Sequence, residues 1–362
     1  MRENIKELVR QTGEKADAFL ICSPVNRRYV TNFETSDGFV VINDGKITFI
    51  TDFRYIEAAQ TAQKNGIIDQ SIRITEQQRS PLEQISEIIG KDKKVLFEDA
   101  YVSVKELTTF RKFMPTANFY SGSQIISTLR ARKDEYELEN IKKAQSITDK
   151  AFTHILTVLS DNVGKPGFTE KDVSLELEFF MRKNGSEGVA FDTISVSGHK
   201  SSLPHGVPEN IPLQKGFLTM DFGARYGGYC SDMTRTVCIG KADEEMKRVY
   251  DTVLKAQKCA LEQISGGIAG NVADGFARSV IDGAGYKGTF GHSLGHSLGL
   301  EIHERPCFSP SDKTAVPSGA VVSVEPGIYI PGKYGVRIED IVYLTDDGCT
   351  DLTHSHKTFT EI

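Results

Sequence analysis

The 362-residue chain lacks the cysteine patterns of disulfide-rich and zinc-binding proteins, and it contains no tryptophan. Its six cysteines show no C-x-x-C spacing: Cys22, Cys230, Cys238, Cys259, Cys307 and Cys349. In a chain of ordinary globular size this scatter predicts reduced thiols. Cys230 and Cys238 lie near Asp232, where a ligand or nucleophile role is the alternative. The preferred interpretation is that they are small buried hydrophobic residues.

Other absences concern partners and location. The net charge is −6 and no basic cluster occurs, which argues against nucleic-acid and membrane-surface binding. The first ten residues are charged throughout, so we expect no signal peptide, and no apolar run reaches the ~20 residues of a membrane-spanning helix. There is no phosphate loop, no G-x-G-x-x-G and no low-complexity segment. These features predict a soluble cytoplasmic protein without a nucleotide cofactor.

The order of expected elements divides the chain at about residue 130. Residues 1–130 alternate apolar strands with amphipathic helices, which indicates a small α/β domain. Residues 131–362 combine long helices with antiparallel hairpins, which indicates a larger α+β domain. Its first helix is expected to begin at Asp134, which forms a capping box with Glu137.

Individual elements follow from periodicity and turn signals. In the first domain we expect strands at 16–23, around 72, at 94–99 and at 117–121, and a hairpin around Asn43-Asp44-Gly45. Helices are expected at 1–10, 54–64, 81–89 and 103–114, with a loop at 25–38 and a break at 122–133. Further helices are expected at 169–184, 243–264 and 271–284.

A pair of acids occurs in the stretch L-T-M-D-F-G-A-R-Y-G-G-Y-C-S-D-M-T-R-T-V, residues 218–237. This stretch predicts a hairpin that turns at Gly227-Gly228. Centring the turn between Tyr226 and Gly227 places Asp221 directly opposite Asp232. Opposed like charges destabilise an antiparallel pair unless a cation neutralises them.

The same arrangement is expected near the C-terminus, where Glu325 and Glu339 fall on strands on either side of a Pro331-Gly332 turn. Pairing residues whose numbers sum to 664 places these two carboxylates opposite each other. An acidic pair in a hairpin is usually a solvated face. Here apolar neighbours such as Met220 and Val324 indicate half-buried strands, in which unpartnered carboxylates are costly.

Imidazoles lie between the two hairpins, in G-H-S-L-G-H-S-L-G-L-E-I-H. They belong to His292, His296 and His303. Four carboxylates and a histidine suit a pair of hard or borderline divalent ions, and the absence of a cysteine cluster argues against a structural zinc site. The sequence therefore predicts a metal centre.

With L-P-H-G-V-P upstream and G-V-R-I-E-D around the last acid, the five residues occur in this order: Asp221, Asp232, His296, Glu325, Glu339. Through this order and the local sequence around it, the chain resembles the dinuclear metallopeptidases with the pita-bread fold. The resemblance covers essentially the whole length of the chain. The chain is more similar to the Xaa-Pro aminopeptidase and prolidase branch than to methionine aminopeptidase. The resemblance implies a pita-bread catalytic domain at 131–362, preceded by a creatinase-type α/β domain at 1–130.

The resemblance also implies site roles. The five residues would bind two ions. Asp232 and Glu339 would bridge both ions. Asp221 would complete the coordination shell of one ion, and His296 and Glu325 would complete that of the other. A metal-bridging hydroxide would attack the peptide bond, with Glu325 as general base. His303 would donate a hydrogen bond to the oxyanion, and His205 and His292 would line the slot for proline.

Some residues around these positions keep alternative interpretations. Arg337 is expected on the face of Glu339, where it pairs either with ligand carboxylates or with a surface acid. His154, His199, His354 and His356 are expected to have no site role. Manganese is the first choice of metal, with cobalt, zinc and iron as alternatives.

The expected activity is that of an Xaa-Pro aminopeptidase, which releases an N-terminal residue linked to proline from short peptides. A prolidase that cleaves only Xaa-Pro dipeptides is the alternative. Metal-free creatine-type hydrolysis and a non-catalytic binding module are further alternatives, which gaps among the five positions would favour. The N-terminal domain has no catalytic motif of its own, and by resemblance it is expected to limit substrate access and to form a homodimer contact.

Overall fold

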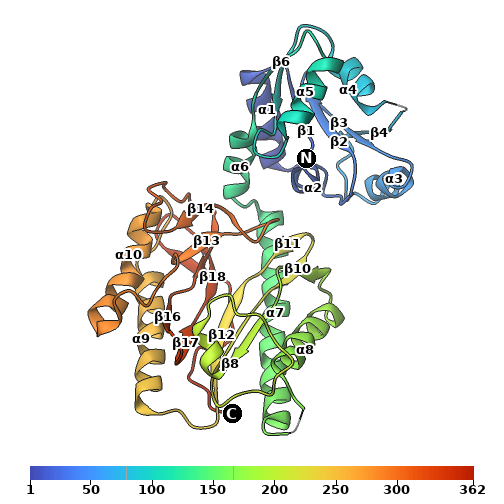
Figure 1. Ribbon diagram of the computed structural model, residues 1–362. Helices are drawn as coiled ribbons and strands as arrows, with labels where there is room; N and C mark the ends of the chain where they lie inside the picture. The colour runs from blue at the N-terminus through green and yellow to red at the C-terminus, as the bar shows by residue number, and fades with distance from the viewer. Residues whose placement is uncertain (79, 166) are drawn as a thin grey trace. The chain divides into compact units, whose positions relative to one another are not determined.

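The computed structural model describes residues 1–78, 80–165 and 167–362. The chain forms two compact units, Met1–Arg130 and Ala131–Ile362 (Figure 1). Within the described ranges, no helix combines the length and the apolar character needed to cross a membrane.

The first unit is built on a six-stranded sheet with the strand order β4-β3-β2-β1-β5-β6. Its neighbours β1–β2 and β2–β3 are antiparallel, while β1–β5, β3–β4 and β5–β6 are parallel. The strands are β1 (Ala18–Ile21), β2 (Phe39–Asn43), β3 (Lys46–Thr51), β4 (Arg73–Glu76), β5 (Lys94–Phe97) and β6 (Asn118–Ser121).

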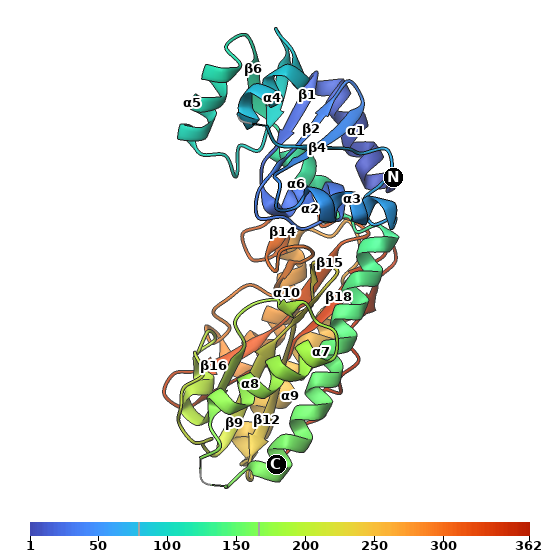
Figure 2. The same ribbon diagram turned by 90° about the vertical axis from the view of Figure 1, so that its right-hand side faces the viewer.

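Helices cover both faces of this sheet, because its central strands are buried on both sides. Figure 2 shows α1 on one face and α4 and α5 on the other. The face toward α4 and α5 carries a core of alternate strand residues such as Leu20, Val41 and Val95. The helices of this unit are α1 (Glu3–Lys15), α2 (Pro24–Thr31), α3 (Ile56–Lys64), α4 (Pro81–Ile89), α5 (Val104–Phe113) and α6 (Ser123–Ala131).

The predicted hairpin around Asp44-Gly45 is confirmed, since Asn43 pairs with Lys46. Two helices were missed. α2 lies inside the predicted loop at 25–38, and its signal was Ser23, whose side chain caps the helix, followed by Pro24 at the first position. α6 lies inside the predicted break at 122–133, where only Ile125, Ile126 and Leu129 give a short apolar pattern.

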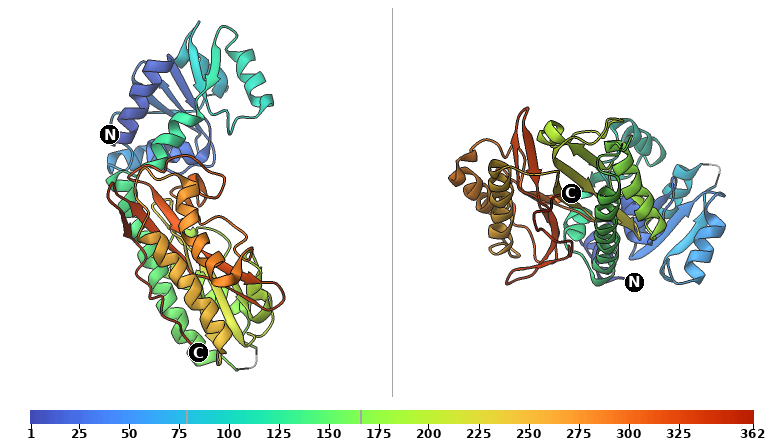
Figure 3. Two further views of the ribbon diagram at one scale, coloured as in Figure 1. Left: turned by 90° about the vertical axis from the view of Figure 1, so that its left-hand side faces the viewer. Right: turned by 90° about the horizontal axis from the view of Figure 1, so that it is seen from below.

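The second unit places pairs of helices on either side of its strands. α7 (Glu135–Asn162) and α8 (Glu170–Lys183) lie on one side, and α9 (Glu244–Leu261) and α10 (Gly270–Ile281) on the other (Figures 1 and 3). The capping boxes at Asp134 and Thr169 begin α7 and α8. Two further turns of helix are η1 (Gly198–Ser202) and η2 (Asp282–Tyr286). Each helix pair has its own apolar core against the strands.

Within its described residues, the strands of this unit form four small sheets, with the orders β11-β10-β7, β12-β9-β8, β14-β13-β15-β18-β19 and β16-β17. The first two contain β7 (Gly188–Val189), β8 (Ile194–Ser197), β9 (Gly216–Phe222), β10 (Ala224–Tyr226), β11 (Tyr229–Cys230) and β12 (Met233–Ile239). The others contain β13 (Gly295–Ser297), β14 (Glu304–Phe308), β15 (Val321–Val324), β16 (Gly327–Ile330), β17 (Tyr334–Arg337), β18 (Asp340–Leu344) and β19 (Cys349–Asp351).

The register of the first acidic hairpin differs from the prediction. Tyr226 pairs with Tyr229, so the turn is centred between Gly227 and Gly228, which both have positive φ. Asp221 therefore lies opposite Thr234, and direct opposition of Asp221 and Asp232 is wrong. Asp232 lies two residues nearer the turn, in the break between β11 and β12.

The register of the second acidic hairpin is confirmed. Val324 pairs with Asp340 and Gly327 pairs with Arg337, and both pairs sum to 664. Glu325 and Glu339 each occupy a short gap between two strands, beside these pairs.

Candidate metal centre

One pocket in the second unit, with a volume of about 560 Å³, brings the predicted site residues together. Its lining includes all five expected ligands and the other candidate residues: Asp221, Asp232, His296, Glu325, Glu339, His205, His292, His303 and Arg337. They come from several segments between residues 205 and 339, so the fold of the second unit creates the site.

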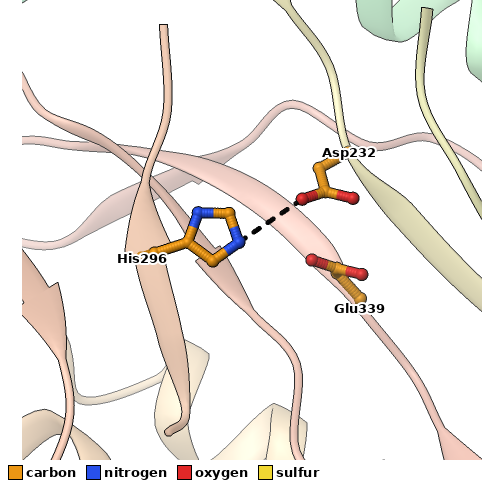
Figure 4. A group of neighbouring side chains, drawn as sticks. All are labelled: Asp232, His296 and Glu339. Carbon is orange, nitrogen blue, oxygen red and sulfur yellow. Dashed lines mark ion pairs between the residues drawn. The ribbon is translucent and has the colours of Figure 1, made fainter. Parts of the chain in front are cut away.

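The group Asp232, His296 and Glu339 has the closest approach of potential ligand atoms. One ligand atom from each lies within 4.8 Å of the others, a spacing that can hold a metal ion. Figure 4 shows the three side chains pointing toward one another from β13, from the break before β12 and from the gap before β18. His296 Nε2 lies 3.5 Å from Asp232 Oδ2.

Glu325 approaches the same ring nitrogen of His296 as Asp232 does. Its Oε1 lies 3.5 Å from His296 Nε2 and accepts a hydrogen bond from Ser323 Oγ at 3.1 Å. His296 can therefore share a cation with either Asp232 or Glu325.

Asp221 is oriented by a buried arginine. Arg337 Nη2 donates to Asp221 Oδ2 at 2.6 Å, and the arginine side chain is almost fully buried. The other oxygen of this carboxylate, Oδ1, is buried without a hydrogen-bond partner. A buried orphan oxygen that lines a pocket of acids is a ligand atom available to a cation.

The clustering of acids changes their pKa values. Burial, with Asp221 and Glu325 nearby, raises the pKa of Asp232 well above its usual range. Burial and the charge of Asp232 do the same to the pKa of Glu339. Burial raises the pKa of Glu325 to about 8. The site thus disfavours its own negative charge in the absence of a cation.

Burial shifts the pKa values of His292 and His296 downward. Burial, with His303 nearby, lowers the pKa of His296 to about 4, and burial, with Arg337 nearby, lowers the pKa of His292 to about 3. Both imidazoles are therefore neutral at physiological pH, and the neutral form of His296 is the one that binds metals. The His296 and His303 rings meet edge to face, with their centroids 4.5 Å apart.

Two further residues of the site were not found from the sequence. Tyr329 OH lies 2.9 Å from His292 Nε2 and accepts from Arg337 Nη1 at 2.8 Å. Because His292 Nδ1 faces the carbonyl of Ser293 at 2.8 Å, the neutral ring carries its proton there, and Tyr329 donates to Nε2.

Thr234 is the second missed residue. Its Oγ1 donates to Glu339 Oε2 at 2.6 Å and accepts from Arg337 Nε at 2.9 Å. The available signal was the correct hairpin register, which places Thr234 opposite Asp221.

Comparison with known proteins gives the family. The model of Metallopeptidase family M24 matches residues 139–346, and that of the Creatinase/Prolidase N-terminal domain matches residues 2–132. The chain belongs to metallopeptidase family M24. It is a metal-dependent hydrolase of peptide bonds with the pita-bread fold, as its resemblance to this family predicted.

Relatives match this M24 peptidase from end to end. It is 35% identical to the Xaa-Pro dipeptidase of Pyrococcus furiosus, over 99% of each chain. The structure of the Xaa-Pro dipeptidase from Bacillus anthracis matches with a TM-score of 0.91 and 37% identity, over 99% of each chain. That of the X-Pro aminopeptidase from Thermotoga maritima matches with a TM-score of 0.89 and 34% identity, over 98% of this chain and 99% of the other.

The donor set of the peptidase fits divalent metal ions. Oxygen-rich shells with one imidazole suit manganese, cobalt, iron or zinc. The unpartnered Oδ1 of Asp221 and the raised pKa values of Asp232 and Glu339 are the properties of a site that needs a cation.

Cys230 and Cys238, the two cysteines nearest Asp232 in the sequence, are both buried. Burial raises the pKa of Cys230 to about 12 and that of Cys238 to about 11, so both remain protonated and unreactive. The buried-hydrophobe interpretation is confirmed for both. Cys307 borders the pocket, and burial raises its thiol pKa as well.

Proposed function

We propose that this M24 peptidase binds two divalent ions through Asp221, Asp232, His296, Glu325 and Glu339. Manganese is the first choice, and cobalt, zinc and iron are alternatives. The convergence of these residues on one pocket supports the assignment. When bound, the ions would supply Lewis acidity and lower the pKa of a water.

The chain's own residues then have separate tasks. Glu325 accepts a proton from the attacking water and delivers it to the leaving nitrogen. His303 donates a hydrogen bond to the substrate carbonyl oxygen as negative charge develops. Arg337 holds Asp221 in one orientation through the 2.6 Å contact.

We propose that the substrate is a peptide whose second residue is proline. The observation that carries this proposal is the pocket lining beside the acids, where His205 and His292 stand with Phe191, Pro204 and Val207. An apolar surface with neutral imidazole rings accepts a rigid pyrrolidine ring. Relatives named Xaa-Pro dipeptidase and X-Pro aminopeptidase support the same bond specificity.

Peptide length separates the two candidate activities. The relatives named dipeptidases favour an Xaa-Pro dipeptide. The pocket favours a longer peptide, because Arg337 is the one lysine or arginine among its described lining residues, and it is already paired with Asp221. A dipeptide would present its C-terminal carboxylate here, where no further described lysine or arginine lines the pocket to pair with it. We therefore retain the aminopeptidase as the first proposal and the dipeptidase as the second.

The test compares Ala-Pro with Ala-Pro-Ala in the presence of manganese. Faster release of alanine from the tripeptide supports the aminopeptidase, and cleavage of the dipeptide alone supports the prolidase. Ala-Ala-Ala is the matched control, and its cleavage at a comparable rate would contradict both. Cytoplasmic location, homodimer formation and substrate restriction by the N-terminal unit remain predictions.

A further inference from the structure

A buried carboxylate outside the metal centre connects three segments of the second unit. Glu170, the first residue of α8, is fully buried. Its Oε1 accepts from the backbone nitrogen of Ser197 at 2.7 Å and from Ser197 Oγ at 3.0 Å. Its Oε2 accepts from Lys200 Nζ at 2.6 Å and from the backbone nitrogen of Glu209 at 3.2 Å. All four donors lie outside its own helix.

Lys200, in η1, extends this network. Besides Glu170, its Nζ donates to the carbonyl of Val207 at 3.1 Å and to Glu209 Oε2 at 2.9 Å. Burial acts to lower the pKa of Lys200, but its bonds to Glu170 and Glu209 outweigh burial and raise it. The ammonium thus stays charged, with all three of its protons donated.

Both residues act on the segment 203–209, which we call the His205 loop. Pro204, His205, Gly206, Val207 and Pro208 all line the pocket. The loop is not held by apolar burial, because Leu203 is 53% exposed and Val207 is 73% exposed. Lys200 instead holds its middle through the Val207 carbonyl, and Glu170 holds its end through the Glu209 amide.

We propose that Glu170 and Lys200 are positioning residues that fix the His205 loop against the pocket and thereby set the binding of the substrate's proline. This inference rests on the proposed function, since it assigns the loop to the proline side of the cleavage site. Neither residue lines the pocket, so both act through the loop. Their loss raises KM far more than it lowers kcat, because the loop's contact with the metal-centre residues is a long hydrogen bond, 3.3 Å from Arg337 Nη1 to the Pro204 carbonyl, whereas Arg337 holds Asp221 at 2.6 Å.

The test uses Lys200→Met in the full-length metal-loaded enzyme. We expect KM for Ala-Pro-Ala to rise about tenfold while kcat changes less than about twofold. Hydrogen exchange gives a second readout independent of activity. The amides of Leu203, Gly206 and Glu209 donate to Lys200, Leu203 and Glu170, and they should exchange about tenfold faster in the variant.

Matched variants separate positioning from general damage. Lys171→Met removes an exposed lysine beside Glu170 and should keep the parent KM and loop exchange. Lys200→Arg keeps the positive charge, so its KM for Ala-Pro-Ala should lie much closer to the parent value than that of Lys200→Met does. Lys200→Met leaves Glu170 buried without its cation, so Glu170→Gln/Lys200→Met provides a variant free of that charge if the single variant fails to fold.

Parent values of KM and loop exchange in either folded variant would overturn the proposal, as would a fall in kcat at constant KM. The two proposals fail distinguishably. If the parent enzyme cleaves no Xaa-Pro peptide, the proposed function fails, while unchanged exchange of the three loop amides contradicts the positioning role by itself.

Discussion

Arg337 and Asp221 form a buried ion pair in which Nη2 and Oδ2 are 2.6 Å apart. The same guanidinium donates through Nε to Thr234 and through Nη1 to Tyr329. It therefore joins strands of both acidic hairpins, β9 and β12 of the first to β16 and β17 of the second. Since only one oxygen of Asp221 is used, the pair orients the carboxylate and leaves Oδ1 available.

Replacing this arginine should affect both stability and activity. In Arg337→Met, Asp221 loses its buried partner, and the free energy of unfolding should fall by about 3–5 kcal/mol. The value of kcat/KM should fall about 10–100-fold as the carboxylate loses its orientation. Arg337→Lys keeps the positive charge but loses the planar guanidinium. Its stability and activity should therefore lie between those of the parent and those of Arg337→Met. Chemical denaturation and peptide hydrolysis measure both effects, and parent activity in Arg337→Met would contradict the role given to the pair.

Thr234 permits a sharper test because valine has nearly the same shape. Thr234→Val removes the donor to Glu339 Oε2 and the acceptor for Arg337 Nε. We expect a loss of about 1–3 kcal/mol in stability and about 10–100-fold in kcat/KM. Thr236→Val is the control on the same strand, since Thr236 Oγ1 donates to the backbone carbonyl of Arg337. It should lose similar stability but much less activity, and equal activity losses would contradict the argument.

Sequence patterns predicted long elements well because their signals are local. The capping boxes at Asp134 and Thr169 depend on residues three apart, and both helices begin there. The helices α2 and α6 were missed because they are short and their apolar patterns are weak. Tertiary contacts rather than periodicity stabilise such segments.

The site was predictable only where its signals are local in the sequence. The acids of the second hairpin were placed in register, since Pro331-Gly332 marks the turn. The first register was wrong by one position in the turn, which moved Asp221 from Asp232 to Thr234. Tyr329 lies 37 residues from His292 and 8 from Arg337, and no local pattern indicates that the three meet.

Neutralising one acid should separate stability from activity. Glu339 is buried beside Asp232, so in metal-free protein Glu339→Gln removes charge repulsion and should raise the melting temperature. Activity should fall more than about 100-fold, because a proposed bridging ligand is lost. The neighbouring Asp340 provides the contrast. Burial alone would raise its pKa, but Arg235 and Lys357 outweigh burial and lower it, so Asp340→Asn should lower the melting temperature. A lower melting temperature in metal-free Glu339→Gln would contradict this account.

Metal removal should expose a pH dependence that the bound ions suppress. In chelator-treated protein burial raises the pKa of Glu325 from 4.5 to about 8. Between these two values the folded state holds a proton that the unfolded state has released, so stability falls as the pH rises. The Glu325 contribution is therefore complete below about pH 4.5 and is lost progressively up to about pH 8. Metal binding needs the ionised carboxylates, so added manganese should stabilise the protein more at pH 8 than at pH 5.

Other acids titrate over the same pH range, so the test uses the difference in stability between the parent and a variant that lacks only the Glu325 carboxyl group. Denaturation of metal-free parent and Glu325→Gln is compared at intervals between pH 5 and pH 8.5. The glutamine variant has no proton to lose at this position, so its stability relative to the parent should rise steadily across the range. A constant difference would show that Glu325 ionises as freely in the folded protein as in the unfolded chain. In that case burial would not control the charge of Glu325 in the metal-free protein.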